Sequence, residues 1–123
     1  MENLDLKKFF KNKKIFITGH SGFKGTWLTF WLKNYGAKVC GVSLKEQGNK
    51  YKFFSSLIDN QIENNFFDIS NIKQIKKKID RFKPEIFFHL ASQPLVIESY
   101  KNPMNTIKSN VIGLNNILEI LRK

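Results

Sequence analysis

The chain has 123 residues, 41% of them hydrophobic, which is enough for one globular domain with a buried core. Lysine and arginine number 21 against 10 aspartates and glutamates, so the formal net charge is +11 at pH 7. Nearly all of this positive charge is lysine, which is typical of a compositional bias and not of an arginine-rich patch that binds phosphates. Without an aromatic stacking platform or a helix-turn-helix pattern, we expect no nucleic-acid partner.

The sequence contains one cysteine, Cys40, and no continuous apolar run near its N-terminus. A single cysteine excludes an internal disulfide and a thiolate metal cage, and a reducing cytoplasm fits this composition. His20 and His89 lack partners at ligand spacing, so we expect no metal site, and His89 is interpreted as a structural, hydrogen-bonded residue. No segment is long enough to span a membrane, and we expect no membrane partner.

After an amphipathic segment at 3–12, the predicted elements alternate between strand and helix. Short apolar runs predict strands at 13–19, 37–43, 62–68 and 85–91. Helices are predicted at 23–35, at 51–58, between Ser70 and Pro84, and from Pro103 to about Arg122, with Ser70 as the cap of the third. Residues 47–50 and 92–102 are predicted loops.

This order favours parallel strands, because each parallel connection needs a crossover helix that covers a face of the sheet. We therefore predict an α/β fold over residues 1–123. It is a doubly wound, Rossmann-like parallel sheet of about four strands with flanking helices, incomplete in this chain.

Three glycines, Gly19, Gly22 and Gly25, follow the first predicted strand and lead into the first long helix. Gly19 permits a tight turn, Gly22 lets backbone N–H groups approach a pyrophosphate, and Gly25 lets the helix pack closely on the strand. The helix N-terminus then faces the phosphates with its partial positive charge. Because a strand precedes the glycines and a helix follows them, the triplet predicts a dinucleotide site.

The spacing G-x-x-G-x-x-G, with "HLASQPLV" and "SNVIGL", resembles the sugar-nucleotide 4,6-dehydratases of the extended short-chain dehydrogenase/reductase superfamily. "GFKG" followed by "WL", with Lys24 where most relatives have an aliphatic residue, narrows the resemblance to members that use CDP-glucose. The resemblance implies an NAD-dependent lyase that converts CDP-glucose to CDP-4-keto-6-deoxyglucose. It also implies a cytoplasmic homodimer in nucleotide-sugar metabolism, such as O-antigen biosynthesis.

The resemblance also assigns site residues. Asp68 would accept a hydrogen bond from the adenine amino group, or, as the alternative, would form a turn or cap before the next helix. Asn110 would help to hold the active-site water and backbone geometry, or would be an ordinary exposed helix residue. The implied substrate positions are Gln93 and Pro94, whereas Ile97 stands where relatives usually have arginine. The implied cofactor-binding residues are Gly19, His20, Ser21, Gly22, Phe23, Lys24, Gly25, Ser43, Asp68, Ile69, Leu90, Ala91, Ser92 and Asn110.

The residues at the end of the second predicted strand do not distinguish NAD from NADP. Ser43 stands where NAD sites usually have an acidic residue, and Lys45 and Glu46 follow it. From the residues alone, NAD and NADP are both compatible, and the resemblance favours NAD.

The catalytic Tyr-x-x-x-Lys pair of the family is absent, because none of Tyr35, Tyr51 and Tyr100 has a lysine four residues later. We therefore expect the chain to be the N-terminal cofactor-binding part of a dehydratase, inactive alone, as a fragment or the product of an interrupted reading frame. The alternatives are a stand-alone dinucleotide-binding module and another epimerase or dehydratase, such as one for GDP-mannose. An apolar flank on the last helix and an open edge at the fourth strand predict self-association.

Overall fold

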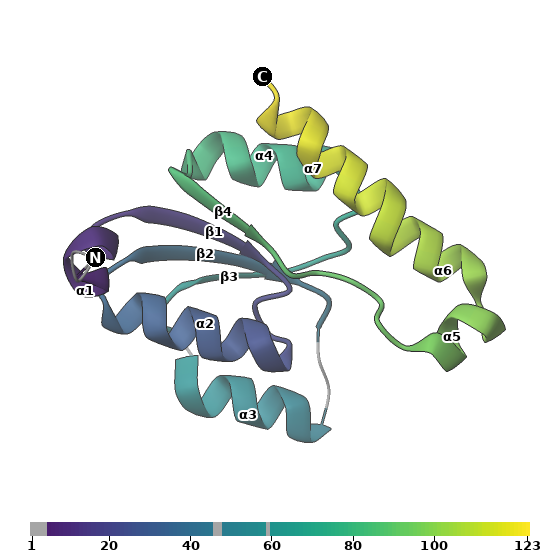
Figure 1. Cartoon of the computed structure of the whole chain (residues 1–123), viewed down its shortest axis with the longest axis horizontal. Helices are drawn as coiled ribbons and strands as arrows, with labels where there is room; N and C mark the ends of the chain where they lie inside the picture. The colour runs from purple at the N-terminus through teal and green to yellow at the C-terminus, as the bar shows by residue number, and fades with distance from the viewer. Residues whose placement is uncertain (1–4, 46–47, 59) are drawn as a thin grey trace.

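The computed structural model describes residues 5–45, 48–58 and 60–123. Its centre is a parallel sheet of four strands, in the order β3-β2-β1-β4 (Figure 1). The strands are β1 (Lys14–Thr18), β2 (Lys38–Ser43), β3 (Glu63–Phe66) and β4 (Ile86–His89). The predicted doubly wound parallel sheet is therefore confirmed.

Helices cover both faces of this sheet (Figure 1). On one face lie α4 (Ile72–Phe82) and α7 (Leu114–Leu121), and on the other lie α2 (Phe23–Asn34) and α3 (Gly48–Ile58). The remaining helices are α1 (Leu6–Phe10), α5 (Val96–Lys101) and α6 (Pro103–Ile107), and a π-helical segment, η1 (Lys108–Gly113), joins α6 to α7.

Both faces of β1 are buried, which explains why its sequence is a continuous apolar run. Phe16 packs with Ile75 and Ile117 on the face covered by α4 and α7. Ile15 and Ile17 pack with Leu32 of α2 on the opposite face. Because successive side chains of a strand point to opposite faces, β1 joins both halves of the core.

Four details of the secondary structure differ from the prediction. Helix α3 begins at Gly48, inside the predicted loop 47–50, of which Gln47 lies outside the described residues. Helix α5 lies in the predicted loop 92–102, and its side chains show no buried stripe that could have indicated it. Asn71, and not Ser70, caps α4, since its Oδ1 accepts the N–H of Gln74 at 3.2 Å. The last predicted helix is interrupted by η1.

Strand β4 lies at the edge of the sheet, and its four residues are only partly buried. The open edge expected at the fourth strand is thus confirmed. Apolar side chains on the neighbouring helices are exposed as well; Val96, Ile97, Met104, Val111 and Leu118 are each more than half exposed. Self-association through these surfaces stays a prediction.

None of the helices described is both long and apolar enough to cross a bilayer. Among the described residues, no three His, Cys, Asp or Glu side chains gather where they could hold a metal ion. Cys40 is fully buried in the core, and burial raises the pKa of its thiol to about 12.

Candidate functional site

A cleft of about 280 Å³ opens at the edge of the sheet where the carboxyl ends of the four strands meet. In doubly wound sheets this edge, at the point where the strand order reverses, is where ligands bind. Eight of the residues assigned from the sequence line the cleft: Gly19, Ser43, Asp68, Ile69, Ala91, Ser92, Gln93 and Pro94.

Two of the three glycines in the turn after β1 are required by the fold itself. Gly19 has a φ of +75°, and a Cβ there would lie 2.7 Å from the backbone nitrogen of Ala91. A Cβ on Gly25 would lie 2.8 Å from the carbonyl carbon of Gly19 and closer still to its oxygen. Glycine at these positions therefore allows α2 and the segment after β4 to pack against the turn.

Gly22 differs from these two glycines, because the nearest atom to a Cβ there is the carbonyl oxygen of Gly19, at an ordinary distance of 3.4 Å. Its backbone is extended, a conformation open to any residue, and it precedes α2 without a side-chain cap for the helix. The N–H groups at a helix N-terminus bind anions, and here no N-cap side chain accepts a hydrogen bond from them. These features fit the pyrophosphate of a dinucleotide.

Hydroxyl groups tie the turn to the neighbouring strands. The buried Oγ atoms of Ser21 and Ser43 lie 2.6 Å apart and share a hydrogen bond between the turn and the end of β2. Thr18 Oγ1 lies 2.6 Å from Nδ1 of His89 and also accepts the N–H of Ala91 at 3.3 Å. Ser43 thus has a structural partner at the position where NAD sites usually have an acidic residue, and His89 is hydrogen-bonded as predicted.

The side chain of His20 lies inside the protein. Its Nε2 lies 3.0 Å from Oδ1 of Asn64, and its ring packs against Phe54 and Phe66 and over Gly41, where a Cβ would lie 2.8 Å from Nδ1. Burial lowers the pKa of His20 to about 4, so the ring is neutral at pH 7. Its fully buried ring does not line the cleft, so only its backbone is available for the predicted pyrophosphate contact.

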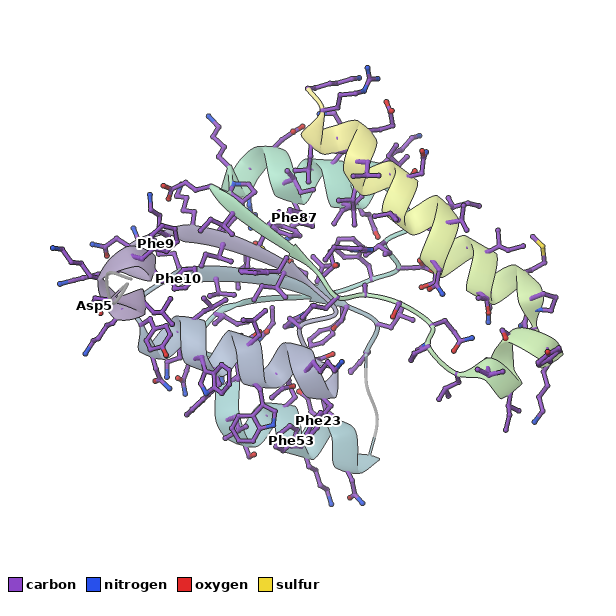
Figure 2. The ribbon with its side chains drawn as sticks, in the orientation of Figure 1. Asp5, Phe9, Phe10, Phe23, Phe53 and Phe87 are labelled. Atoms are coloured by element: carbon purple, nitrogen blue, oxygen red, sulfur yellow. The ribbon has the colours of Figure 1, made fainter. Side chains whose placement is uncertain are left out.

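Phe23 and Lys24 are exposed at the start of α2. The ring of Phe23 stacks on that of Phe53 from α3, with 6.0 Å between centroids (Figure 2). Ser21, Gly22 and Phe23 line a second hollow of about 340 Å³ between α2 and α3, whereas Lys24 lies on an outer groove of α2. The residues predicted to line the turn therefore lie at two different places: Ser21, Gly22 and Phe23 at the second hollow, and Lys24 on the outer groove of α2.

Asp68 follows β3 and lies in the cleft wall. Its Oδ1 accepts the N–H of Ser70 at 2.8 Å, and its Oδ2 lies 3.5 Å from Nζ of Lys108. Partial burial acts to raise the pKa of Asp68, but the hydrogen bonds from Ser70 and the ammonium of Lys108 outweigh it and hold the pKa below its usual value. The carboxylate thus forms the turn that was the alternative, and it also lines the cleft, while its contact with adenine stays a prediction.

Asn110, in η1, holds the loop that follows β4. Its Oδ1 accepts the N–H of Gln93 at 2.7 Å, and its Nδ2 donates to the carbonyl of Gln93 at 3.0 Å. The amide of Gln93 is itself hydrogen-bonded to Leu95 and Thr106. Asn110 therefore fixes backbone geometry at the cleft, while its contact with an active-site water stays a prediction.

Comparison with known families matches residues 16–123 to the family described as GDP-mannose 4,6 dehydratase. The chain belongs to this family. It is 39% identical to CDP-glucose 4,6-dehydratase of Salmonella typhimurium over 95% of this chain and 33% of that protein. The resemblance inferred from the glycine turn is thus confirmed at the level of the dehydratase family.

Solved structures show the same fold. The epimerase Mth375 of Methanothermobacter thermautotrophicus has a TM-score of 0.83 and 25% identity over 96% of this chain and 34% of its own. The UDP-glucose 4-epimerase of Thermus thermophilus, solved in complex with NAD, has a TM-score of 0.76 and 22% identity over 88% of this chain and 33% of its own. The chain spans about a third of the length of these relatives.

Four residues that line the cleft were not predicted from the sequence: Leu44, Asn105, Lys108 and Ser109. The last three lie at positions i, i+3 and i+4, so they share one side of a helix. That spacing was a usable signal, but nothing in the sequence indicates which side of the last helix faces the cleft. Leu90, which was assigned to the site, does not line the cleft, although its backbone packs against Gly19.

Proposed function

We propose that this chain forms the NAD-binding part of a sugar-nucleotide 4,6-dehydratase that acts on CDP-glucose. The observation that supports the cofactor site most directly is Gly22. The packing of the chain leaves room for a side chain there, and the position lies at the uncapped N-terminus of α2. The 39% identity to CDP-glucose 4,6-dehydratase supports the substrate.

The proposed cofactor site takes in both the cleft, which Gly19 lines, and the second hollow, which Gly22 lines. The backbone of the glycine turn binds the pyrophosphate, Asp68 and Ile69 bind the adenine end, and Ala91 and Ser92 lie along the ribose and nicotinamide end. When bound, NAD would supply the acceptor, and later the donor, of a hydride. Gln93 and Pro94 lie next to the position proposed for the nucleotide sugar.

The whole enzyme is proposed to be a cytoplasmic homodimer. Exposed apolar side chains on α5, α6 and η1 support a partner surface, and the buried thiol of Cys40 is compatible with a reducing compartment. The alternative of a stand-alone binding module is not favoured, because the similarity to a dehydratase runs through 95% of the chain.

The test is isothermal titration of the purified chain with NAD, NADP and, as a control ligand without a second nucleotide, ADP. We expect NAD to bind, with ADP binding more weakly and NADP no more tightly than NAD. Absence of binding to both dinucleotides by a chain that is folded by circular dichroism would refute the proposal.

A further inference from the structure

The π-helical segment η1 contacts both walls of the cleft. Toward the loop after β4, Asn110 makes its two hydrogen bonds to Gln93. Toward the loop after β3, Lys108 reaches Asp68, and Gly113 packs so closely on Ile69 that a Cβ would lie 2.6 Å from its Cδ1. Single-turn π segments inside helices often occur at functional sites, and this one contacts both loops.

A second contact strengthens the connection to the loop after β3. Asn116, buried at the start of α7, donates from Nδ2 to the carbonyl of Ser70 at 3.0 Å. The segment that contains Asp68 is therefore held from the helix by the ion pair with Lys108, by Gly113 and by Asn116. Of these three contacts, only the ion pair acts on the side chain of Asp68 itself.

Besides Lys108, the residue that contacts the carboxylate of Asp68 is Ser70. Ser70 donates to Oδ1, and the Oδ2 atom contacts Lys108, while about two fifths of the side chain stays exposed at the cleft. A carboxylate oxygen has room for two hydrogen bonds, so an oxygen that contacts Lys108 can still accept from a ligand. In the described part of the chain, no other lysine or arginine lines this cleft.

From these contacts we propose that Lys108 is a positioning residue for base recognition. It holds the Asp68 carboxylate in the cleft wall, so that an oxygen of Asp68 accepts a hydrogen bond from the exocyclic amino group of the dinucleotide's adenine. This inference rests on the proposed dinucleotide site and assigns one of its residues a role in specificity. A base with a carbonyl oxygen in place of that amino group would face the carboxylate with an acceptor and bind more weakly.

The experiment compares NAD with nicotinamide hypoxanthine dinucleotide, which has the carbonyl oxygen in place of the amino group. Dissociation constants are measured by titration for the unaltered chain and for Lys108→Met, Lys108→Arg, Asp68→Asn and the double variant Lys108→Met with Asp68→Asn. Lys73→Met is the matched control, because it removes the same charge from an exposed position on α4 that does not line the cleft. Thermal melts confirm that each variant is folded.

We expect Lys108→Met to weaken NAD binding by about three- to tenfold and to leave binding of the hypoxanthine analogue nearly unchanged, so that the preference for adenine falls. Lys108→Arg should keep the preference, and adding Lys108→Met to Asp68→Asn should have little further effect. If Lys108→Met weakens both dinucleotides equally, or changes neither, the positioning role is wrong even though the dinucleotide site stands. If the unaltered chain binds neither dinucleotide, the proposed function fails instead.

Discussion

The substitution Gly22→Val should weaken dinucleotide binding strongly while it changes the stability of the fold little. Gly22 has an extended backbone, and a Cβ there would meet only the carbonyl oxygen of Gly19 at 3.4 Å. The chain can therefore fold with a side chain at this position. That side chain, however, would stand in front of the N–H groups of the first turn of α2, where we propose that the pyrophosphate binds.

The expected effects differ by position and can be given magnitudes. Valine is a poor helix N-cap, so Gly22→Val should lower the free energy of unfolding by no more than about 1 kcal/mol. If it removes two hydrogen bonds to a charged phosphate, worth about 1.5–3 kcal/mol each, NAD binding should weaken by at least about 100-fold. Gly25→Ala is the matched contrast, because its Cβ would overlap the carbonyl of Gly19, and it should destabilise the fold by about 3 kcal/mol or more.

Calorimetric titration with NAD and chemical denaturation, both applied to the unaltered chain, Gly22→Ala, Gly22→Val and Gly25→Ala, measure the two effects independently. Binding should fall in order of side-chain size at position 22 while the midpoint of unfolding hardly changes. Equal NAD affinity in the unaltered chain and Gly22→Val would refute the pyrophosphate site. A Gly22→Val chain that unfolds as readily as Gly25→Ala would refute the claim that only a ligand needs the space.

Three further predictions follow from the composition and packing of the chain. The pKa of His20 is about 4 in the folded protein against 6.5 as the ordinary value, so its contribution to stability is complete above pH 6.5 and is lost at up to about 1.4 kcal/mol per pH unit as the pH falls toward 4. Denaturation of the unaltered chain and of His20→Phe at pH 7 and 4.5 should show this loss only in the former, and parallel pH profiles would contradict it. The 123 residues contain no Tyr-x-x-x-Lys pair, so incubation with CDP-glucose and NAD should give no 4-keto product by chromatography, whereas measurable turnover would show that another base is present. Leu118 is 58% exposed, so Leu118→Lys should reduce light scattering and leave the free energy of unfolding unchanged to within about 0.5 kcal/mol. Ile117 is buried, so Ile117→Lys should unfold the chain. A monomer whose melting temperature does not depend on protein concentration would remove the expectation of self-association.

The sequence predicted the features that are local in origin. Each strand is a short apolar run because both faces of the sheet are covered, and the roles of Gly19 and Gly25 follow from one strand-to-helix turn. Features that depend on distant packing were not predictable. The direction of the His20 ring depends on Gly41 and Asn64, which lie on β2 and β3.

The last helix illustrates the same limit. Its apolar spacing indicated a helix, but the π turn at Lys108–Gly113 is stabilised by contacts to two separate loops, which no periodicity encodes. Helix α5 was missed because its apolar residues, Val96 and Ile97, are exposed and give no periodic buried stripe. The cleft residues Asn105, Lys108 and Ser109 were missed because helical periodicity does not indicate which side of the last helix contacts distant loops.

The fit of His20 over Gly41 also restricts how this chain can vary during evolution. A methyl group at position 41 would overlap the ring of His20, whereas a small residue at position 20 would leave a void beside β2. Mutation at position 41 alone should therefore be eliminated by selection, and it becomes acceptable only after position 20 has lost its ring. Homologous sequences that differ from this chain at position 41 are expected to differ at position 20 as well, although the two positions lie 21 apart in the sequence.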